Sequence, residues 1–133
     1  MKIAPRKLIA AAALARRHGL APYSGFKVGA ALLTGSGQIV RGANVESASY
    51  GLTCCAERVA LFTALTEGAS HIAAIAVVAR VKRGPMPCGA CRQLLAEYAP
   101  AAIVFVADSA RPADVRVFSV KELLPLPFLA GDW

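Results

Sequence analysis

Residues 72–107 read IAAIAVVARVKRGPMPCGACRQLLAEYAPAAIVFVA, and this stretch decides the fold. Two apolar runs rich in Ile, Val and Ala, at 72–81 and 102–107, predict buried strands that are covered on both faces. Between them, a loop at 82–87 leads into an expected helix at 88–98. A right-handed crossover connects such strands within one sheet, so the stretch predicts the centre of an α/β fold.

The segments before this stretch predict a helix, a hairpin and a second helix, separated by loops. Pro5 at its start and Gly19 just past its end frame the first helix, and a Gly-rich turn is typical of the hairpin. The second helix is apolar almost all round, so we expect it to be buried on more than one side, with another subunit as the second surface. The expected ranges are helix 5–18, loop 20–26, strands 27–33 and 38–45 around turn 34–37, loop 44–53 and helix 55–67.

After this stretch, a short strand is expected at 115–118. Ser119 and Glu122 have the spacing of a capping box, which predicts a short helix ending near Leu124. The order helix, hairpin, helix, strand, helix, strand, strand, helix indicates one mixed sheet with helices on both faces. The expected fold is therefore α/β, a three-layer α/β/α sandwich with a mixed central sheet of about five strands, in a single domain over residues 1–133.

The composition excludes several classes of protein. Hydrophobic residues make up 56% of the 133 residues and charged residues 17%, with a mean hydropathy of +0.52. These values exclude a disordered tail, a collagen-like repeat and a low-complexity linker. The longest apolar runs, at 8–15 and 72–79, are far shorter than the ~18–20 residues that cross a bilayer, so a membrane-spanning protein is excluded as well.

The net charge of +7 raises the question of an anionic partner. The basic residues are scattered in pairs along the chain, without a basic stripe interleaved with aromatics, so nucleic acid is not the expected partner. Basic residues before the apolar run 8–15 faintly resemble a signal peptide. The run ends in Arg16-Arg17-His18-Gly19, however, which is typical of a helix end, and we expect an ordinary first helix and a cytoplasmic protein.

The four cysteines fall in two clusters, which favours metal or redox chemistry over disulfides. Cys88 and Cys91 are three residues apart at the start of an expected helix, so both face one way and can bind one metal ion. A thioredoxin-like redox pair is the alternative for this spacing. Cys55 also lies at an expected helix start. Because right-handed crossovers place both helix starts at the same end of the sheet, we expect the two clusters to meet there.

One sulfur from Cys55 and two from Cys88 and Cys91 would form a three-cysteine site. Zinc takes four ligands, so one position stays open for water. A structural four-cysteine site would need Cys54 too, but adjacent side chains point in different directions, so Cys54 is expected to be a small neighbour. Glu57 is the acid–base candidate, because a carboxylate beside zinc-bound water can take its proton and pass it on. The alternative is a first-turn Glu that merely suits the helix dipole.

Three thiolates around one Zn²⁺ leave a net negative charge, which weakens the metal as a Lewis acid. Arg58 directly follows Glu57, and Arg92 directly follows Cys91. We expect at least one of these guanidinium groups to hydrogen-bond a ligand sulfur and withdraw negative charge from the site.

Together these motifs resemble those of the small, homotetrameric cytidine deaminases, a family of zinc-dependent enzymes. The resemblance covers nearly the whole chain. Its matching segments are Cys55-Ala56-Glu57-Arg58, Pro87-Cys88-Gly89-Ala90-Cys91-Arg92-Gln93, Tyr23-Ser24-Gly25-Phe26-Lys27-Val28-Gly29-Ala30-Ala31, Asn44-Val45-Glu46, Ser49-Tyr50, and Leu123-Leu124-Pro125 followed by Phe128.

The resemblance implies a role for each matched residue. Cys55, Cys88 and Cys91 would bind one zinc ion per chain, and Glu57 would be the proton shuttle. Substrate binding would fall to Phe26 against the pyrimidine, Asn44 and Glu46 on the ribose hydroxyls, the Ala56 backbone at the O2 edge of the base, and Ala48, Tyr50 and Phe128 reaching a neighbouring subunit's site. Phe26 and Phe128 as plain core residues, and Tyr50 as a plain interface residue, are the alternatives.

The implied reaction is the hydrolytic deamination of cytidine and 2′-deoxycytidine to uridine and 2′-deoxyuridine, a step of pyrimidine salvage, by zinc-activated water in a cytoplasmic homotetramer. No membrane or nucleic-acid partner is implied. One alternative is a zinc deaminase of the same fold that acts on another aminopyrimidine nucleoside, such as an N4-modified cytidine or blasticidin S. A remote alternative is a redox or structural-zinc protein with no hydrolytic role.

Overall fold

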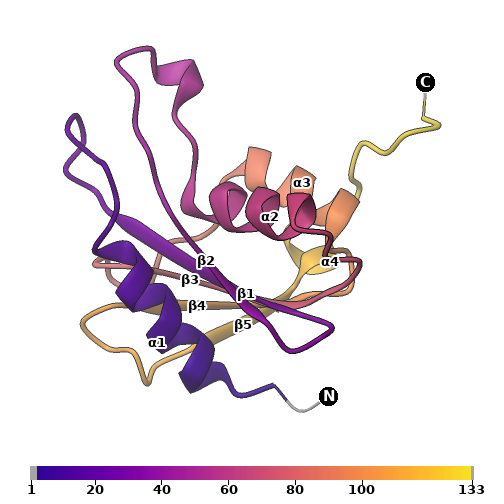
Figure 1. The fold of residues 1–133 in the computed structure, drawn as a ribbon, viewed down its shortest axis with the longest axis horizontal. Helices are drawn as coiled ribbons and strands as arrows, with labels where there is room; N and C mark the ends of the chain where they lie inside the picture. Colours follow the sequence, from indigo (N-terminus) through magenta and orange to yellow (C-terminus); the bar gives the residue numbers. More distant parts are fainter. Residues whose placement is uncertain (1–2, 133) are drawn as a thin grey trace.

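The five strands form one mixed sheet in the order β2-β1-β3-β4-β5, in a computed structural model that describes residues 3–132 (Figure 1). β3 and β4 are parallel, and the other neighbouring pairs are antiparallel. The mixed five-stranded sheet is therefore confirmed. The strands are β1 Val28–Thr34, β2 Ile39–Ala43, β3 Ile72–Ala79, β4 Ile103–Asp108 and β5 Arg116–Ser119.

Helices cover both faces of the sheet, which confirms the three-layer sandwich. Figure 1 shows helices on both sides of the sheet, and two separate clusters of buried apolar side chains fill the spaces between the layers. The helices are α1 Pro5–Arg16 on the first face, and α2 Ala56–Thr66, α3 Gly89–Tyr98 and α4 Val120–Leu123 on the second, with a 3-10 turn η1 at Tyr50–Leu52.

Two glycines allow the first two helices to pack directly onto the strands. A Cβ on Gly29 of β1 would lie 2.0 Å from the carbonyl oxygen of Ala12 in α1. A Cβ on Gly42 of β2 would lie 2.5 Å from the backbone nitrogen of Ala60 and 2.6 Å from the carbonyl oxygen of Ala56, both in α2. The start of α2 is thereby fixed against the sheet.

The ends of several elements differ from the predicted ranges. α1 stops at Arg16 rather than His18, because the chain tightens into a turn in which the backbone nitrogen of His18 donates to Ala15. β2 stops at Ala43, and Val45 instead makes single backbone bridges to Leu20 and Cys54. β3 stops at Ala79, where a turn begins with a bond from the backbone nitrogen of Val81 to the carbonyl oxygen of Ala79.

Shifts of one or two residues affect the other elements. Cys55 and Cys88 are the extended N-cap residues of α2 and α3 rather than their first helical residues, and α2 ends at Thr66. β1 begins at Val28, β4 at Ile103 and β5 at Arg116. The loop expected at 44–53 contains the turn η1.

The predicted capping box is confirmed: the Glu122 backbone nitrogen donates to Ser119 Oγ at 3.0 Å, and the Ser119 backbone nitrogen donates to Glu122 Oε1 at 3.1 Å. Among residues 3–132, none of the helices has the length and apolar composition needed to cross a bilayer.

Candidate metal centre and active site

Three cysteine sulfurs meet where α2 and α3 begin. Cys55 caps α2, Cys88 caps α3, and Cys91 lies in the first turn of α3. The Sγ atoms of Cys55 and Cys88 are 3.8 Å apart, those of Cys88 and Cys91 are 3.5 Å apart, and all three lie within 4.8 Å of one another. The two cysteine clusters, far apart in the sequence, therefore converge at one end of the sheet.

The spacing of these sulfurs fits zinc. Zn–S bonds of ~2.3 Å in a tetrahedron place the sulfurs about 3.8 Å apart, and the separations of 3.8 Å and 3.5 Å are close to this value. Cys54 is not part of the group. Its backbone pairs with Val45, and burial raises the pKa of its thiol. The three sulfurs therefore leave a fourth tetrahedral position for a ligand that is not a cysteine.

The protonation of the sulfurs is uneven, and this also suits a metal site. Hydrogen bonds from Cys91, Arg58 and Cys88 lower the pKa of Cys55 to about 5, outweighing the effect of burial. The hydrogen bond to Cys55 and burial raise the pKa of Cys91. One thiolate is thus already formed near neutral pH, and a divalent cation would displace the remaining protons.

Arg58 lies against the thiolate, as the sequence analysis expects of at least one of the two arginines. Its Nη2 donates to Cys55 Sγ and to the carbonyl oxygen of Thr53, each at 3.4 Å. The hydrogen bond to Cys55 raises the pKa of Arg58, so the guanidinium stays charged. Arg58 Nε is buried and has no hydrogen-bond partner within residues 3–132.

Arg92 holds the backbone rather than a sulfur. Its Nε donates to the carbonyl oxygen of Pro87 at 2.8 Å, and its Nη1 donates to the carbonyl oxygen of Leu123 at 3.0 Å. These bonds tie the loop before Cys88 to α4. Arg92 therefore stabilises the loop that precedes Cys88.

Glu57 is buried beside the sulfurs, with 5% of its surface exposed. Burial raises its pKa to about 7, and the neighbouring Cys55 thiolate adds to this, although hydrogen bonds and Arg58 oppose it. A first-turn Glu that served only the helix dipole would gain nothing from such burial. The environment is typical of a carboxyl group that exchanges protons.

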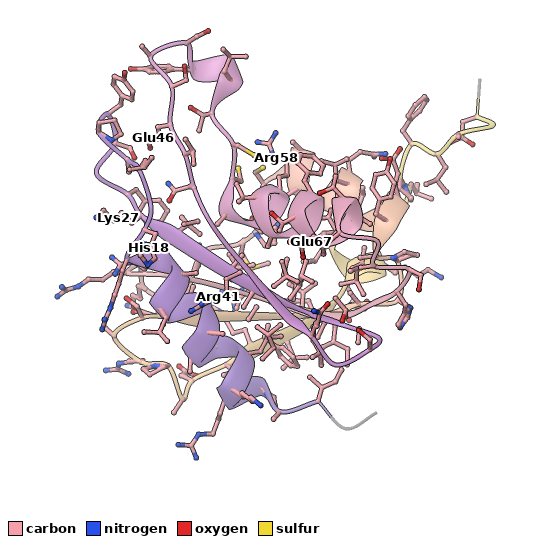
Figure 2. All side chains as sticks on the ribbon, in the orientation of Figure 1. His18, Lys27, Arg41, Glu46, Arg58 and Glu67 are labelled. Atoms are coloured by element: carbon pink, nitrogen blue, oxygen red, sulfur yellow. The ribbon has the colours of Figure 1, made fainter. Side chains whose placement is uncertain are left out.

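A cavity of about 190 Å³ opens directly onto Glu57. Six residues with expected site roles line it, together with four that the sequence analysis did not single out. The six are Phe26, Asn44, Glu46, Cys55, Ala56 and Glu57, and the four are Val28, Thr53, Val77 and Pro85. In Figure 2, Glu46 and Arg58 lie toward the end of the molecule where α2 begins, and Glu67 lies near the opposite end of that helix.

A second cavity of about 370 Å³ adjoins the first, since both include Glu46 and Thr53 in their walls. The rings of Tyr23 and Tyr50, which help to line it, meet edge to face with centroids 6.1 Å apart. Tyr50 is 75% exposed and Phe128 59% exposed. Ala48 is exposed as well, so these three expected substrate residues stand outside the first cavity within one chain.

Two functional contributions escaped the sequence analysis. The carbonyl oxygen of Thr53 accepts from Arg58, and its Oγ1 accepts from the Ser47 backbone nitrogen at 3.1 Å. Ser24 contacts Glu46 across a separation of 22 residues. Ser24 lies in a segment that carried the family resemblance, but only the contact itself indicates what it does.

The fold and the three-sulfur centre beside a buried carboxyl group define a zinc-dependent hydrolase. The family model for the cytidine and deoxycytidylate deaminase zinc-binding region matches residues 3–107. The chain belongs to this cytidine and deoxycytidylate deaminase family, and the zinc expected from its cysteines is confirmed as the family's metal.

Individual relatives agree with this membership over most of their length. A cytidine deaminase of Halalkalibacterium halodurans is 52% identical over 125 residues, which cover 94% of each chain. The crystal structure of a cytidine deaminase from Burkholderia pseudomallei has a TM-score of 0.89 and 49% identity, covering 95% of this chain and all of the other. A blasticidin-S deaminase of Bacillus cereus is 30% identical over 109 residues, covering 76% of each.

Proposed function

We propose that this protein is a zinc-dependent cytidine deaminase, which hydrolyses cytidine and 2′-deoxycytidine to uridine and 2′-deoxyuridine with release of ammonia. It would act in pyrimidine salvage in the cytoplasm, as a homotetramer of single-domain subunits. The observation that carries the proposal is the convergence of three sulfurs beside the buried Glu57, where Cys55 and Glu57 line a cavity.

In the proposed site, Cys55, Cys88 and Cys91 hold the zinc, and Arg58 offsets part of the negative charge of their thiolates. Bound zinc supplies a water molecule of lowered pKa as the nucleophile. Glu57 would take one proton from that water and give it to N3 of the base, and would then take the remaining proton of the attacking oxygen and deliver it to the amine, which leaves as ammonia. Its burial excludes bulk water from this exchange.

The nucleoside is proposed to lie in the cavity above Glu57 with its sugar toward the loops 20–26 and 44–53. Asn44 and Glu46 would bind the ribose hydroxyls, an amide and a carboxylate being suited to that. Phe26, 42% exposed at the cavity wall, would pack against the pyrimidine. The backbone of Ala56 would meet the O2 edge of the base.

Substitution of Glu57 tests the proposed catalytic role. Glu57→Gln is expected to retain one zinc per chain and to lose turnover by about 10²- to 10⁴-fold, because the proton shuttle is removed while the shape is kept. Glu67→Gln, the same change at the other end of the helix, is the matched control and should leave both values unchanged. Near-normal turnover in Glu57→Gln would contradict the assignment.

The substrate class is tested with a panel of cytidine, 2′-deoxycytidine, N4-methylcytidine and blasticidin S, with ammonia release as the readout. Cytidine and 2′-deoxycytidine are expected to give the highest kcat/KM. Blasticidin S is a second candidate because of the similarity to the Bacillus cereus enzyme. A preference for it would support the hydrolytic deamination and contradict cytidine as the substrate. Zinc without ammonia release from any compound would favour a structural metal.

A further inference from the structure

The segment from Tyr23 to Val28 is bound to both of the proposed ribose-binding residues. Asn44 Nδ2 donates to the carbonyl oxygen of Phe26 at 2.8 Å, and Asn44 Oδ1 accepts from the Val28 backbone nitrogen at 2.9 Å. Because both partners are backbone atoms, one an acceptor and the other a donor, they fix the orientation of the Asn44 side-chain amide. The same segment supplies Phe26 to the cavity wall.

The same segment also binds Glu46, at its Tyr23 end, through two backbone nitrogens and the hydroxyl of Ser24. Its Oε1 accepts from the backbone nitrogens of Tyr23 at 3.0 Å and Ser24 at 3.1 Å. Its Oε2 accepts from Ser24 Oγ. These hydrogen bonds, that of the Ser24 hydroxyl first, lower the pKa of Glu46. Glu46 is therefore a carboxylate that can only accept hydrogen bonds.

The hydroxyl of Ser24 has a second partner. While it donates to Glu46, its oxygen accepts from the backbone nitrogen of Phe26 at 3.0 Å. A single oxygen atom thus joins the proposed acceptor for the sugar to the backbone of the residue proposed to pack against the base. Phe26 is held from both sides, because Asn44 binds its carbonyl oxygen.

We propose that Ser24 is the positioning residue for sugar recognition: its hydroxyl orients the Glu46 carboxylate toward the ribose hydroxyls and fixes it relative to Phe26. This inference rests on the proposed function, in which Glu46 binds the ribose. Ser24 does not contact the reacting atoms, so it contributes to substrate binding and to selection for nucleosides that carry sugar hydroxyls, and not to the chemical step.

The test compares cytidine with 2′,3′-dideoxycytidine, which lacks the 2′ and 3′ hydroxyls of the sugar, in the zinc-loaded enzyme. Ser24→Ala is expected to raise KM for cytidine about tenfold, because a hydrogen bond to a charged group is lost at an exposed position. kcat for cytidine should stay within about twofold, and KM for the dideoxynucleoside should change little. The preference for cytidine over its dideoxy analogue therefore falls about tenfold.

Two further variants separate positioning from structure. Ser24→Thr retains a hydroxyl and is expected to restore most of the preference. Ser70→Ala, the same truncation at an exposed site between α2 and β3, should match the wild type. Because Ser24 is an exposed loop residue, alanine there leaves both buried clusters intact, and thermal unfolding of each variant checks this.

The possible outcomes distinguish this inference from the proposed function. An equal rise in KM for both nucleosides, or no rise for either, would overturn the role of Ser24 while leaving the deaminase intact. The same holds if Ser24→Thr behaves like Ser24→Ala. A wild-type enzyme that released ammonia from neither nucleoside would instead refute the proposed function.

Discussion

Arg58 holds a positive charge against the sulfur that ionises most readily. Its Nη2 lies 3.4 Å from Cys55 Sγ, and the same contact lowers the pKa of Cys55 and raises that of Arg58. A hydrogen bond to a ligand sulfur withdraws electron density from the metal. We therefore propose that Arg58 would adjust how strongly bound zinc acidifies its water, without serving as a ligand.

Replacing Arg58 should separate metal binding from turnover. Arg58→Ala is expected to keep zinc and to lower kcat/KM by about 10- to 100-fold, the usual cost of removing such a partner. The measurement is zinc content together with a pH–rate profile. Arg41→Ala, which removes an exposed arginine on β2, is the control. Full turnover of Arg58→Ala at every pH would show that the negative charge of the thiolates does not need to be offset by Arg58.

Glu57 makes the stability of the zinc-free protein depend on pH. Its pKa is about 7 when folded, against 4.5 for the unperturbed group. The folded state therefore holds more protons than the unfolded state between these values, and stability falls as pH rises through this window. Since a shift of one pKa unit corresponds to about 1.36 kcal/mol, the unfolding free energy falls by about 3 kcal/mol in total once the pH is above 7.

Glu57→Gln removes this titration. In the zinc-free, reduced state, the variant should match the wild type near pH 4.5 and become more stable than it as pH approaches 8, with unfolding monitored by circular dichroism in denaturant. A difference that stayed constant with pH would mean that Glu57 is solvated in the folded chain.

At the scale of elements, the contact between β2 and α2 positions Cys55 and Glu57. Gly42→Ala would place a methyl group 2.5 Å from the backbone of α2, which no side-chain rotation can relieve. We expect a loss of about 1–3 kcal/mol in unfolding free energy and weaker zinc binding, because the start of the helix moves.

Zinc titration and thermal unfolding of Gly42→Ala measure the two effects. The control is Gly35→Ala, whose methyl group would meet the exposed side chain of His71, 3.1 Å from Cδ2 and 3.2 Å from Cβ, and which should change little. Unchanged zinc affinity in Gly42→Ala would indicate that the ligands adjust independently of the helix.

Local patterns predicted the elements, and contacts between distant segments explain what was missed. The Ser119 capping box involves residues three positions apart, so it could be read directly. By contrast, Val45 leaves β2 to pair with Leu20 and Cys54, and neither partner is adjacent in the sequence. Cys55 lies just before α2 rather than inside it, and it makes no side-chain cap hydrogen bond that would mark this boundary in the sequence.

The same reasoning applies to the site. The grouping of the three cysteines was predictable because zinc chemistry restricts both residue type and spacing, and the crossover geometry brings the helix starts together. The bonds from Tyr23 and Ser24 to Glu46 have no equivalent signal, since a backbone nitrogen is present at almost every residue. Only the folded loops identify those donors.

At the scale of the whole molecule, large apolar side chains remain exposed on the face that carries α2 and around the cavities. Phe62 on α2 is 41% exposed, Leu52 74% and Tyr50 75%. Exposed apolar surface of this kind marks association. In the proposed homotetramer these side chains would be covered, and Tyr50 would complete a neighbour's site.

Phe62→Lys should disrupt this association. The wild type is expected to have a solution mass about four times the 13.8 kDa of one chain, and the variant a lower mass and reduced turnover, because a buried charge opposes association. Light scattering and activity at matched concentrations measure both. Leu14→Lys, on the opposite face and 48% exposed, is the comparison. A wild-type protein that was monomeric and fully active would refute the expected dependence of turnover on association.

The central sheet also divides the molecule into two regions under different constraints. The cluster between the sheet and α1, which includes Ile9 and Val78, lies on the other side of the strands from the sulfurs. We expect substitutions that repack this cluster to change the melting temperature more than they change the catalytic face. Protein engineers seeking a more durable enzyme therefore have a region in which to start.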